Sequence, residues 1–436
     1  MSERLALRGG TPVVPQALHR RWPVITDEDK AAVLAVLDSG IVSGPYAPQV
    51  KALEEEWARY CGVRFALTTN SGTAALHTAV AAAGIGTGDQ VITTAFTFLA
   101  TALAVLQHNA VPVFVDIDPR TFTIDPTKIE ERITSRTKAI IPVHIHGVPA
   151  DMDWILAVAR KHGLTVIEDA AQAHGSVYKG KKAGSLGDMG CFSFQSSKNL
   201  PAGEGGILVT DREELRLRAN RFRMFGEDIQ ESDRKAFDPT RPLDGTREYN
   251  SLMMCWMYRT TELTAALCRS QLRRLDSWLA NTRANAAYLT EHLVKIPGIT
   301  PPFVPPDCTS SYYQYRIRLN PSAAGSNSPP KEFRLKVLAA LKAEGVEVSL
   351  WQTVPVPGQT LFQEQAGYGL SCPWKCPLGE EVKYDLAEFP ETLRLLQDSL
   401  VIGSHSYPLF PQSLELIRAY VEAFHRVFAN LDQVLG

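Results

Sequence analysis

Hydrophobic and polar residues alternate in blocks between residues 65 and 210, with short apolar runs separated by segments of helical periodicity. The apolar runs are rich in β-branched residues and have the length of strands. Strands are expected at FALTTN, DQVITTA, VPVFVDID, TKAIIPVHI, LTVIEDA, DMGCFSF and GGILVT. Continuous apolar strands joined by helices are typical of a mostly parallel sheet that is buried on both faces. The pattern therefore predicts an α/β fold.

Helices are expected between these strands and on both sides of the block. The first follows Thr26, which precedes three acidic residues as a helix cap does, and Ser39-Gly40 ends it. The expected helices cover residues 26–39, 48–60, 71–84, 98–109, 128–133, 151–163, 260–295, 330–345 and 411–434. One further strand, YYQYRIRLN, is expected near residue 315.

The length of 436 residues exceeds the usual span of one hydrophobic core, so we expect two packed domains. Residues 1–25 read as an irregular N-terminal arm. Residues 26–275 form the larger domain, and a polar, highly charged stretch at 228–252 reads as an insertion in it. Residues 276–436 form a smaller C-terminal α+β domain, in which SAAGSNSPP at 322–330 is expected to be a surface loop.

Composition excludes several functional classes. The net charge of −2 gives no electrostatic reason to expect nucleic acid or an acidic membrane surface as a partner. No signal peptide or membrane-spanning run is visible, so we expect a cytoplasmic protein. The seven cysteines are scattered, and the lone C-x3-C of Cys372 and Cys376 lacks a second pair. We expect reduced thiols there and no metal site.

Two candidate groups lie where expected strands end. Asn70-Ser71-Gly72-Thr73 joins a strand to a helix, where small residues and the helix N-terminus favour an anion, although a plain helix cap explains it equally well. Asp169 ends LTVIEDA at the sheet edge where α/β folds bind ligands. Its carboxylate can hold a pyridine nitrogen in the protonated form; a structural ion pair is the alternative. Glu168 alternates to the opposite face.

Lys198 lies in a Gly-rich turn after an apolar strand, in FSFQSSKNLPAGEGG. A lysine that forms a Schiff base must lose its proton and is therefore partly desolvated. An exposed lysine in a turn is the ordinary alternative. Phe98 follows another strand, where an aromatic ring can stack on a planar cofactor or pack in the core. Together these features predict pyridoxal 5′-phosphate as cofactor.

These residues resemble the DegT/StrS-type family of sugar aminotransferases, which are pyridoxal-phosphate enzymes of fold type I. The resemblance covers about residues 20–275 and is looser in the C-terminal third. It rests on NSGTAALH, TFLAT, VDID, VHIHGVPADMD, IEDAAQAHG, FSFQSSKNLPAGEGG and RTTELTAALCRSQLRRLD. The family implies an aspartate-aminotransferase-like fold with a seven-stranded sheet, and a homodimer with its active sites at the interface.

Carried onto this sequence, the resemblance makes Lys198 the residue that binds the cofactor and moves the proton. It makes Asp169 the partner of the pyridine nitrogen and Gln172 the neighbour of the ring hydroxyl. The dehydratases of the family carry His in place of this lysine, so Lys198 favours transamination over dehydration.

The resemblance also assigns the remaining cofactor contacts. Gly72, Thr73 and Ser193 become phosphate ligands, and Phe98 becomes the stacking ring. The sequence around Gln195 is similar to that of a subgroup that contains aminocyclitol aminotransferases and 3-amino-5-hydroxybenzoate synthases of antibiotic biosynthesis.

Three residues are implied on the substrate side. His405 lies in SLVIGSHSYPLF, which is similar to a segment that carries a substrate-side His in the family. Tyr258 and Arg259 belong to a Trp-Met-Tyr-Arg run, where the family usually has Tyr-Asn-Tyr-Arg and its Asn reaches the partner subunit's cofactor phosphate. Met257 stands in place of that Asn and cannot donate a strong hydrogen bond.

The resulting hypothesis is an aminotransferase that carries an amino group from glutamine or glutamate to a keto-sugar or keto-cyclitol in antibiotic biosynthesis. One alternative is a pyridoxal-phosphate enzyme with dehydrating and aromatising chemistry. A non-catalytic regulator on the same fold would be expected to lose Lys198 or Asp169, and both are present. A nucleotide-binding protein is disfavoured because G-x-G-x-x-G and a Walker-type lysine are absent from the sequence.

Overall fold

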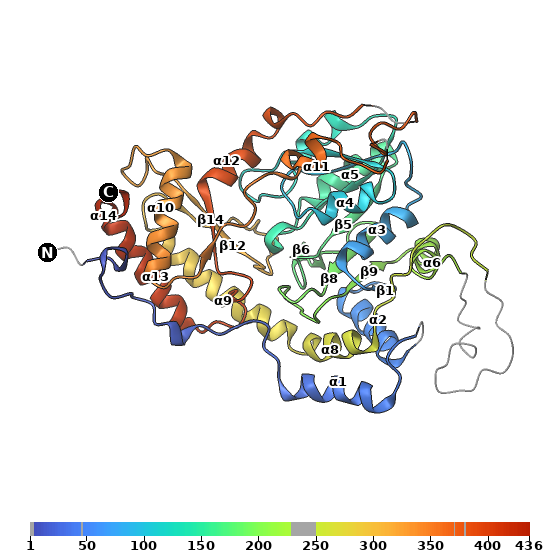
Figure 1. Ribbon diagram of the computed structural model, residues 1–436, viewed down its shortest axis with the longest axis horizontal. Helices are drawn as coiled ribbons and strands as arrows, with labels where there is room; N and C mark the ends of the chain where they lie inside the picture. Colours follow the sequence, from blue (N-terminus) through green and yellow to red (C-terminus); the bar gives the residue numbers. More distant parts are fainter. Residues whose placement is uncertain (1–3, 45–46, 228–249, 370, 379–380) are drawn as a thin grey trace.

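Two larger sheets, each with its own helices, form the body of the molecule (Figure 1). A third, small sheet has the order β11-β6-β7 and consists of β6 Val177–Tyr178, β7 Lys181–Lys182 and β11 Cys308–Thr309. The computed structural model describes residues 4–44, 47–227, 250–369, 371–378 and 381–436. The larger sheet has seven strands in the order β1-β9-β8-β5-β4-β2-β3. Their bounds are β1 Phe65–Thr69, β2 Gln90–Thr94, β3 Val111–Val115, β4 Thr137–Ile141, β5 Thr165–Asp169, β8 Met189–Ser193 and β9 Gly206–Thr210.

The larger sheet is mostly parallel, as predicted. Strands β3, β2, β4, β5 and β8 pair parallel with their neighbours, whereas β9 runs antiparallel to both β8 and β1. The strands β2, β8 and β9 are buried along their whole length. Burial on both faces explains why the strands read as continuous apolar runs rather than as alternating ones. All seven lie at the positions expected from the sequence.

Helices cover the larger sheet and connect it to the rest of the chain. Helix α3 lies against β8 and β9, and α5 lies against β4 and β5. The helices of this part are α1 Asp27–Ser39, α2 Pro48–Cys61, α3 Gly72–Ala82, α4 Ala100–Leu106, α5 Met152–His162, α6 Glu213–Phe222 and α8 Glu262–Leu272. The cap of α1 is confirmed, because the Thr26 side chain accepts from the Asp29 amide and Gly40 ends the helix at φ 69°.

Three helix predictions were wrong in their extent. Residues 128–133 form two short 3-10 turns, Pro126–Lys128 and Glu130–Arg132, because so short a segment does not offset the cost of nucleating an α-helix. The stretch 260–295 is divided at Arg273 and Arg274 into α8 and α9 (Leu275–Leu293). The closing helix is likewise divided at Asn430, into α13 (Leu414–Ala429) and α14 (Leu431–Leu435).

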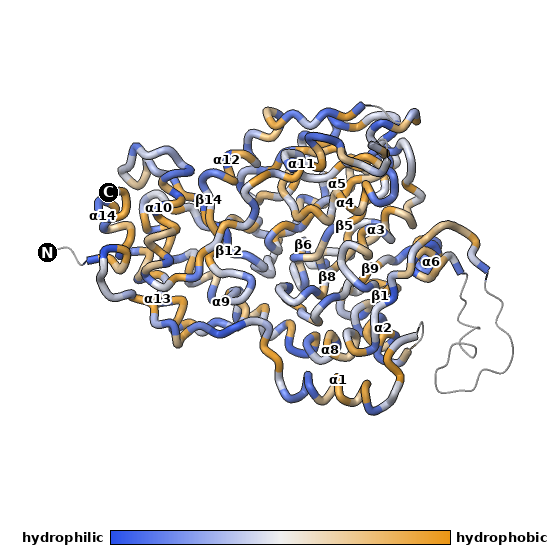
Figure 2. Tube along the Cα trace, in the orientation of Figure 1, coloured by the Kyte–Doolittle hydropathy of each residue, from blue (hydrophilic) through white to orange (hydrophobic). Residues whose placement is uncertain are grey.

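A four-stranded antiparallel sheet forms the second body, in the order β10-β12-β14-β13. Its strands are β10 Ile299–Thr300, β12 Tyr315–Leu319, β13 Val348–Ser349 and β14 Ser399–Ile402. It packs with α9, α10 (Pro330–Ala343) and α13 around a core of its own. Figure 2 shows hydrophilic residues interrupting the hydrophobic ones along α10 and α13, as expected for helices with one buried face.

Part of the C-terminal chain returns to the larger sheet. The Val356 amide donates to the Ala95 carbonyl at 3.0 Å, and the Tyr384 hydroxyl donates to the Pro112 carbonyl at 2.9 Å. The short helix α11 (Thr360–Gln363) and neighbouring residues pack there, whereas α12 (Pro390–Asp398) leads back to β14. The division into an arm and two domains at residues 25 and 275 stays a prediction.

The structure tests several other sequence predictions only in part. Most of the expected insertion at 228–252 lies outside the described residues. No helix among the described residues is long and apolar enough to cross a membrane. Within the same residues, no group of three or more His, Cys, Asp or Glu side chains is placed to hold a metal ion. Cys372 and Cys376 are both free thiols.

Candidate active site

Asp169 ends β5 at the carboxyl edge of the larger sheet and is 6% exposed. One carboxylate oxygen accepts a hydrogen bond from the Thr101 hydroxyl at 2.7 Å, and the other accepts from the Ala171 amide at 3.1 Å. These two donors fix the orientation of the carboxylate. Glu168 points the other way, as predicted, and accepts from the amides of Gly184, Leu186 and Gly187.

Lys198 lies in a tight turn between β8 and β9. The turn is closed by hydrogen bonds from the Lys198 amide to the Gln195 carbonyl at 2.8 Å and from the Ala202 amide to the Phe194 carbonyl at 2.7 Å. The Trp22 indole donates to the Lys198 carbonyl at 3.1 Å, which ties the turn to the N-terminal part of the chain. The ammonium lies 4.7 Å from the centre of the Tyr313 ring, a cation–π contact in a partly buried position.

The N-terminus of α3 lies beside the end of β8. Ser71 caps the helix by accepting from the Ala74 amide at 3.0 Å, which leaves the amides of Gly72 and Thr73 without partners inside the helix. A Cβ atom on Gly72 would lie 2.6 Å from the Cβ of Ser193, so only glycine allows this approach. The helix end, its partial positive charge and the Ser193 hydroxyl thus form a small concave site that suits an anion.

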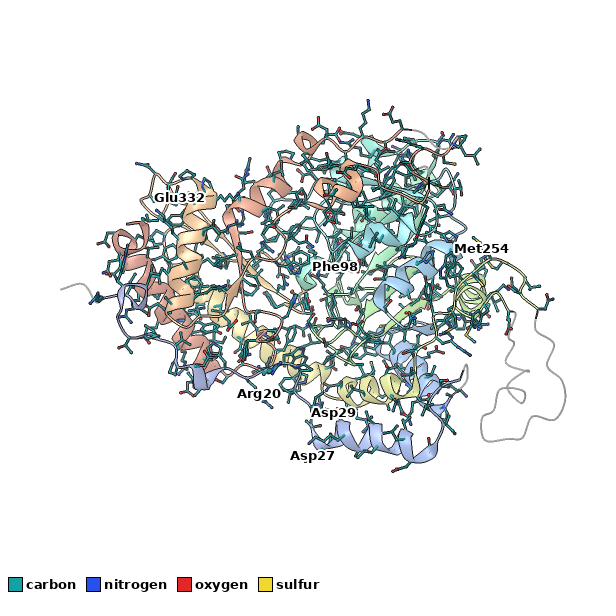
Figure 3. All side chains as sticks on the ribbon, in the orientation of Figure 1. Arg20, Asp27, Asp29, Phe98, Met254 and Glu332 are labelled. Atoms are coloured by element: carbon teal, nitrogen blue, oxygen red, sulfur yellow. The ribbon has the colours of Figure 1, made fainter. Side chains whose placement is uncertain are left out.

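A cavity of about 350 Å³ brings the predicted cofactor residues together. It is lined by Gly72, Thr73, Phe98, Asp169, Gln172, Ser193, Lys198 and His405, and also by Thr97, Gln195, Ser197, Glu204, Tyr313 and Trp351. Phe98 precedes α4 and is 56% exposed, and Figure 3 places it near the middle of the molecule, between the two bodies. So large an exposed fraction is unusual for Phe and is not explained by packing within the core.

Gln172 is held from behind by the segment that follows β4. Its side-chain oxygen accepts from the His146 amide at 2.7 Å, which leaves the amide nitrogen as the group available to the cavity. The His146 ring accepts from the buried guanidinium of Arg316 on β12 at 3.0 Å. Burial, and then the cation of Arg316, lowers the pKa of His146 well below its usual value. A neutral ring can accept this hydrogen bond. The bond from Arg316 to His146 therefore joins the two bodies behind Gln172.

Two further histidines stay neutral near Lys198. Burial, followed by the nearby Lys198 cation, lowers the pKa of His174 to about 3. The same two causes lower the pKa of His405, which lines the cavity. Neither imidazole therefore carries charge at neutral pH, and Lys198 is the cation among the described residues that line this cavity.

Tyr258 and Arg259 are not among the residues that line this cavity within one chain. The Tyr258 hydroxyl makes a 2.9 Å hydrogen bond with the buried ring of His77, and its carbonyl accepts from the Asn70 amide at 2.8 Å. Both contacts fix the segment behind the β1–α3 turn. A substrate-binding role for Tyr258 and Arg259 stays a prediction, and within one chain their position does not favour it.

Sequence reasoning missed several residues in the cavity wall and one residue, Thr101, that lies behind Asp169. Thr101 lies within the TFLAT motif, but the motif alone does not show that its hydroxyl donates a hydrogen bond to Asp169. Ser197 is adjacent to Lys198, and its hydroxyl lies 3.1 Å from that of Tyr313. Tyr313 and Trp351 come from the loosely matching C-terminal third, and nothing in the sequence marks them.

The arrangement fits pyridoxal phosphate. The close approach of Gly72 to Ser193 at the α3 N-terminus suits a phosphate, while Asp169 offers an oriented carboxylate and Lys198 an amine in the same cavity. An acid, an amine and an anion site on one sheet edge can hold a charged pyridine ring and transfer protons next to it.

Comparison with known proteins agrees with this geometry. Residues 23–399 match the DegT/DnrJ/EryC1/StrS aminotransferase family. The spore coat polysaccharide biosynthesis protein SpsC of Bacillus subtilis is 38% identical over 94% of this chain and 97% of its own length. An L-glutamine:2-deoxy-scyllo-inosose aminotransferase of Streptoalloteichus tenebrarius is 40% identical over 73% of this chain and 75% of its own.

Among solved structures, 3-amino-5-hydroxybenzoic acid synthase superposes with a TM-score of 0.79 at 27% identity, covering 95% of this chain and 100% of that one. The fold-type-I architecture expected from the sequence is thereby confirmed. This chain belongs to the DegT/DnrJ/EryC1/StrS aminotransferase family and is a pyridoxal-phosphate-dependent aminotransferase.

Proposed function

We propose that this enzyme transfers an amino group from glutamine or glutamate to a keto-sugar or keto-cyclitol, with Lys198 and Asp169 as its catalytic residues. The observation that carries the proposal is the meeting of Lys198, Asp169 and the α3 N-terminus in one cavity. Bound pyridoxal phosphate supplies an electron sink for the electrons of a broken C–H bond.

Each binding role follows from the position of a side chain. Gly72, Thr73 and Ser193 would hold the phosphate, because they form the concave anion site at the start of α3. The Asp169 carboxylate, oriented by Thr101, would hold the proton on the pyridine nitrogen. Gln172 would donate its amide N–H to the ring hydroxyl, because its oxygen is already occupied by the His146 amide.

Lys198 would move the proton. Its Nζ would hold the cofactor covalently until an amino donor displaces it. The freed amine would then be the base that takes the proton from the α-carbon of the donor and the acid that gives it back at the neighbouring carbon. Phe98 would cover one face of the ring.

The named relatives support the substrate classes. One is an L-glutamine:2-deoxy-scyllo-inosose aminotransferase, and another, 37% identical, is GDP-perosamine synthase of Caulobacter vibrioides. Glutamine as donor, the setting in antibiotic biosynthesis and a cytoplasmic location are parts of the proposal. The alternative, dehydration with aromatisation, is favoured by the likeness to 3-amino-5-hydroxybenzoic acid synthase; it predicts a product that carries no nitrogen from the donor.

We also propose a homodimer. Two segments joined by hydrogen bonds, from the Phe225 amide to the Trp256 carbonyl and from the Leu252 amide to the Gly226 carbonyl, form one exposed surface. Its apolar side chains include Phe225 (53% exposed), Met254 (79%) and Met257 (42%). Apolar clusters of this kind are commonly covered by another protein surface. Figure 3 shows Met254 at the edge of the larger body.

The spectrum of the purified protein with pyridoxal phosphate tests the reaction. We expect a yellow visible band that L-glutamine or L-glutamate converts to the near-ultraviolet band of the aminated cofactor. Lys198→Ala is expected to lack the yellow band, whereas the exposed Lys161→Ala is expected to behave as the wild type. A band that forms but responds to neither amino acid would rule out these donors and favour the alternative chemistry.

A further inference from the structure

A buried arginine from the second body lies behind the cofactor cavity. Arg316 on β12 is 2% exposed, and its Nε donates to the Nε2 atom of His146 at 3.0 Å. Its other nitrogens donate to the Ser399 hydroxyl and to the Trp351 carbonyl, each at 2.7 Å. Together the three bonds fix the orientation of the guanidinium. Of the three, the bond to His146 crosses to the body that carries the larger sheet.

His146 has an unusual backbone conformation. It lies in the 3-10 turn Ile145–Gly147 after β4, with φ 56° and ψ 10°. Residues other than glycine seldom adopt this left-handed region, because it costs free energy that the surroundings must offset. The His146 ring packs edge-on against Phe96 and Trp351, with ring centroids 5.7 and 5.0 Å apart, and accepts the bond from Arg316. These contacts hold the turn in its strained form.

The strained turn directs the His146 amide at Gln172. The amide donates to the side-chain oxygen of Gln172 at 2.7 Å. A carboxamide has an accepting oxygen and a donating nitrogen at two ends of nearly equal shape, so half a rotation would exchange them. The His146 amide favours the orientation in which the nitrogen is left for the cavity. The Gln172 carbonyl accepts from the Ser311 hydroxyl at 2.8 Å, which fixes the backbone as well.

Packing alone does not account for an arginine at this place. Burial, and then the cation of Arg334, lowers the pKa of Arg316 to about 9. The lowered pKa reflects the cost of removing a charge from water, and an apolar side chain would fill the same space without that cost. In some proteins a buried charge of this kind is retained because it fixes one arrangement of the groups around it. Here the arrangement includes the turn that orients Gln172.

We propose that Arg316 is a positioning residue for the amino transfer: it holds the His146 turn and thereby keeps the amide nitrogen of Gln172 directed at the cofactor's ring hydroxyl. The inference rests on the proposed function, in which Gln172 makes that contact. Neither Arg316 nor His146 lines the cavity, so both would act through Gln172.

The pH dependence of the yellow band of the loaded protein tests this role. The band belongs to the form in which the nitrogen that joins Lys198 to the cofactor is protonated. A hydrogen bond to the ring oxygen stabilises the anion of that oxygen and so weakens its hold on the neighbouring proton. Loss of the bond therefore raises the pH at which the band is half lost. We expect Gln172→Leu to raise this midpoint by about 1 unit and Arg316→Met by at least about 0.5 unit.

Ser399→Ala is the matched control, because it removes another hydrogen bond of the same guanidinium and leaves the bond to His146 in place. It is expected to keep the midpoint of the wild type. Arg316→Met combined with Gln172→Leu is expected to give the midpoint of Gln172→Leu alone, because Arg316 acts through Gln172. Additive shifts in the double variant, equal shifts in Arg316→Met and Ser399→Ala, or no shift in Arg316→Met would overturn the inference.

Two further outcomes separate the inference from the proposed function. A wild-type midpoint in Gln172→Leu would refute the contact of Gln172 with the ring hydroxyl, and the role of Arg316 with it. If no amino donor converts the band, the proposed function fails, while the midpoints still decide whether Arg316 positions Gln172.

Hydrogen exchange of the loaded protein measures the first step directly. We expect the peptide 143–150, which contains the amide bonded to Gln172, to exchange at least about tenfold faster in Arg316→Met than in the wild type or in Ser399→Ala. Unchanged exchange would overturn the inference. If Arg316→Met does not fold, the pair His146→Phe and Arg316→Met replaces it, since apolar side chains then meet on both sides.

Discussion

At the residue scale, the neighbours Asp169 and Glu168 have opposite surroundings within one strand. Asp169 faces the cavity and is oriented by the Thr101 hydroxyl and the Ala171 amide. Glu168 is fully buried on the other face, where three backbone amides and the His144 ring surround it. The alternation of side chains along a strand separates a candidate catalytic group from a structural one.

This separation predicts different outcomes for two conservative substitutions. Asp169→Asn is expected to lower the rate of cofactor amination by about 10²–10³-fold with little change in stability, because the oriented negative charge is lost. Glu168→Gln is expected to lower the free energy of unfolding by about 1–3 kcal/mol, because buried amides lose their acceptor. Stopped-flow absorbance and chemical denaturation measure the two effects. Equal rates for wild type and Asp169→Asn would contradict the role of Asp169.

Gly72 permits a second test at this scale. An alanine there would place its Cβ 2.6 Å from that of Ser193, so helix α3 or β8 must shift. We expect Gly72→Ala to raise the dissociation constant of pyridoxal phosphate by at least about tenfold, as the loss of a strong hydrogen bond would. Gly86→Ala is the matched control, since a Cβ at Gly86 meets no atom within 4 Å. Unchanged affinity in Gly72→Ala would show that the phosphate binds elsewhere.

At the element scale, α1 is held to α8 and to the segment after it by one buried carboxylate. Asp29 accepts from the Thr26 amide at 2.8 Å and from the Arg274 guanidinium at 2.7 Å, and Figure 3 shows it on the side of α1 that faces α8. Burial raises the pKa of Asp29, but these hydrogen bonds and the Arg274 charge outweigh it, so the pKa is lowered overall. The charged form therefore stabilises the fold.

A lowered carboxyl pKa fixes the direction of the pH dependence. The stabilisation is fully present above the unfolded pKa of about 4 and is lost as the pH falls through the lower folded value. We expect Asp29→Asn to lower the free energy of unfolding by about 1.5–3 kcal/mol at pH 7 and by progressively less below about pH 4. Asp27→Asn, whose side chain is 97% exposed, is the control from the same helical turn. Denaturation curves at several pH values measure the free energy of unfolding of both variants. A difference between Asp29→Asn and the wild type that does not change with pH would contradict the account.

The elements also show where the sequence was informative. Strands β1 to β5, β8 and β9 were predictable because burial on both faces makes each a continuous apolar run bounded by turn residues. The break between α8 and α9 was not predictable, because Arg273 and Arg274 are good helix formers and the break depends on tertiary packing. The residues proposed to hold the cofactor lie close to strand ends, which is why the sequence could indicate that they meet in one cavity. Tyr313 and Trp351 come from distant segments that only the folded chain brings to the cavity.

At the scale of the whole molecule, two bodies share one site. The Arg316 guanidinium on β12 donates to the His146 ring beside the larger sheet, to the Ser399 hydroxyl at 2.7 Å and to the Trp351 carbonyl at 2.7 Å. Burial, and then the cation of Arg334, lowers the pKa of Arg316 to about 9, so it remains charged at neutral pH. This guanidinium connects the body that carries Lys198 to the body built on the four-stranded sheet.

The exposed apolar surface around Met254 predicts the assembly. Met254→Glu is expected to raise the dissociation constant of the dimer by at least about tenfold, because a charge would be buried against the second copy. Leu335→Glu, at a 42% exposed position on α10, is expected to leave it unchanged. Sedimentation velocity over a range of concentrations measures both variants. A wild type that sediments as a monomer throughout would contradict the proposed dimer.

The central claim is that Lys198 carries the cofactor. Borohydride reduction of the pyridoxal-phosphate-loaded protein fixes the cofactor to the amine that holds it, and peptide mass spectrometry then identifies that residue. The account predicts the added mass on the peptide that contains Lys198 and on no other lysine. The cofactor fixed to a different lysine, or no fixed cofactor in a protein that shows the yellow band, would contradict it.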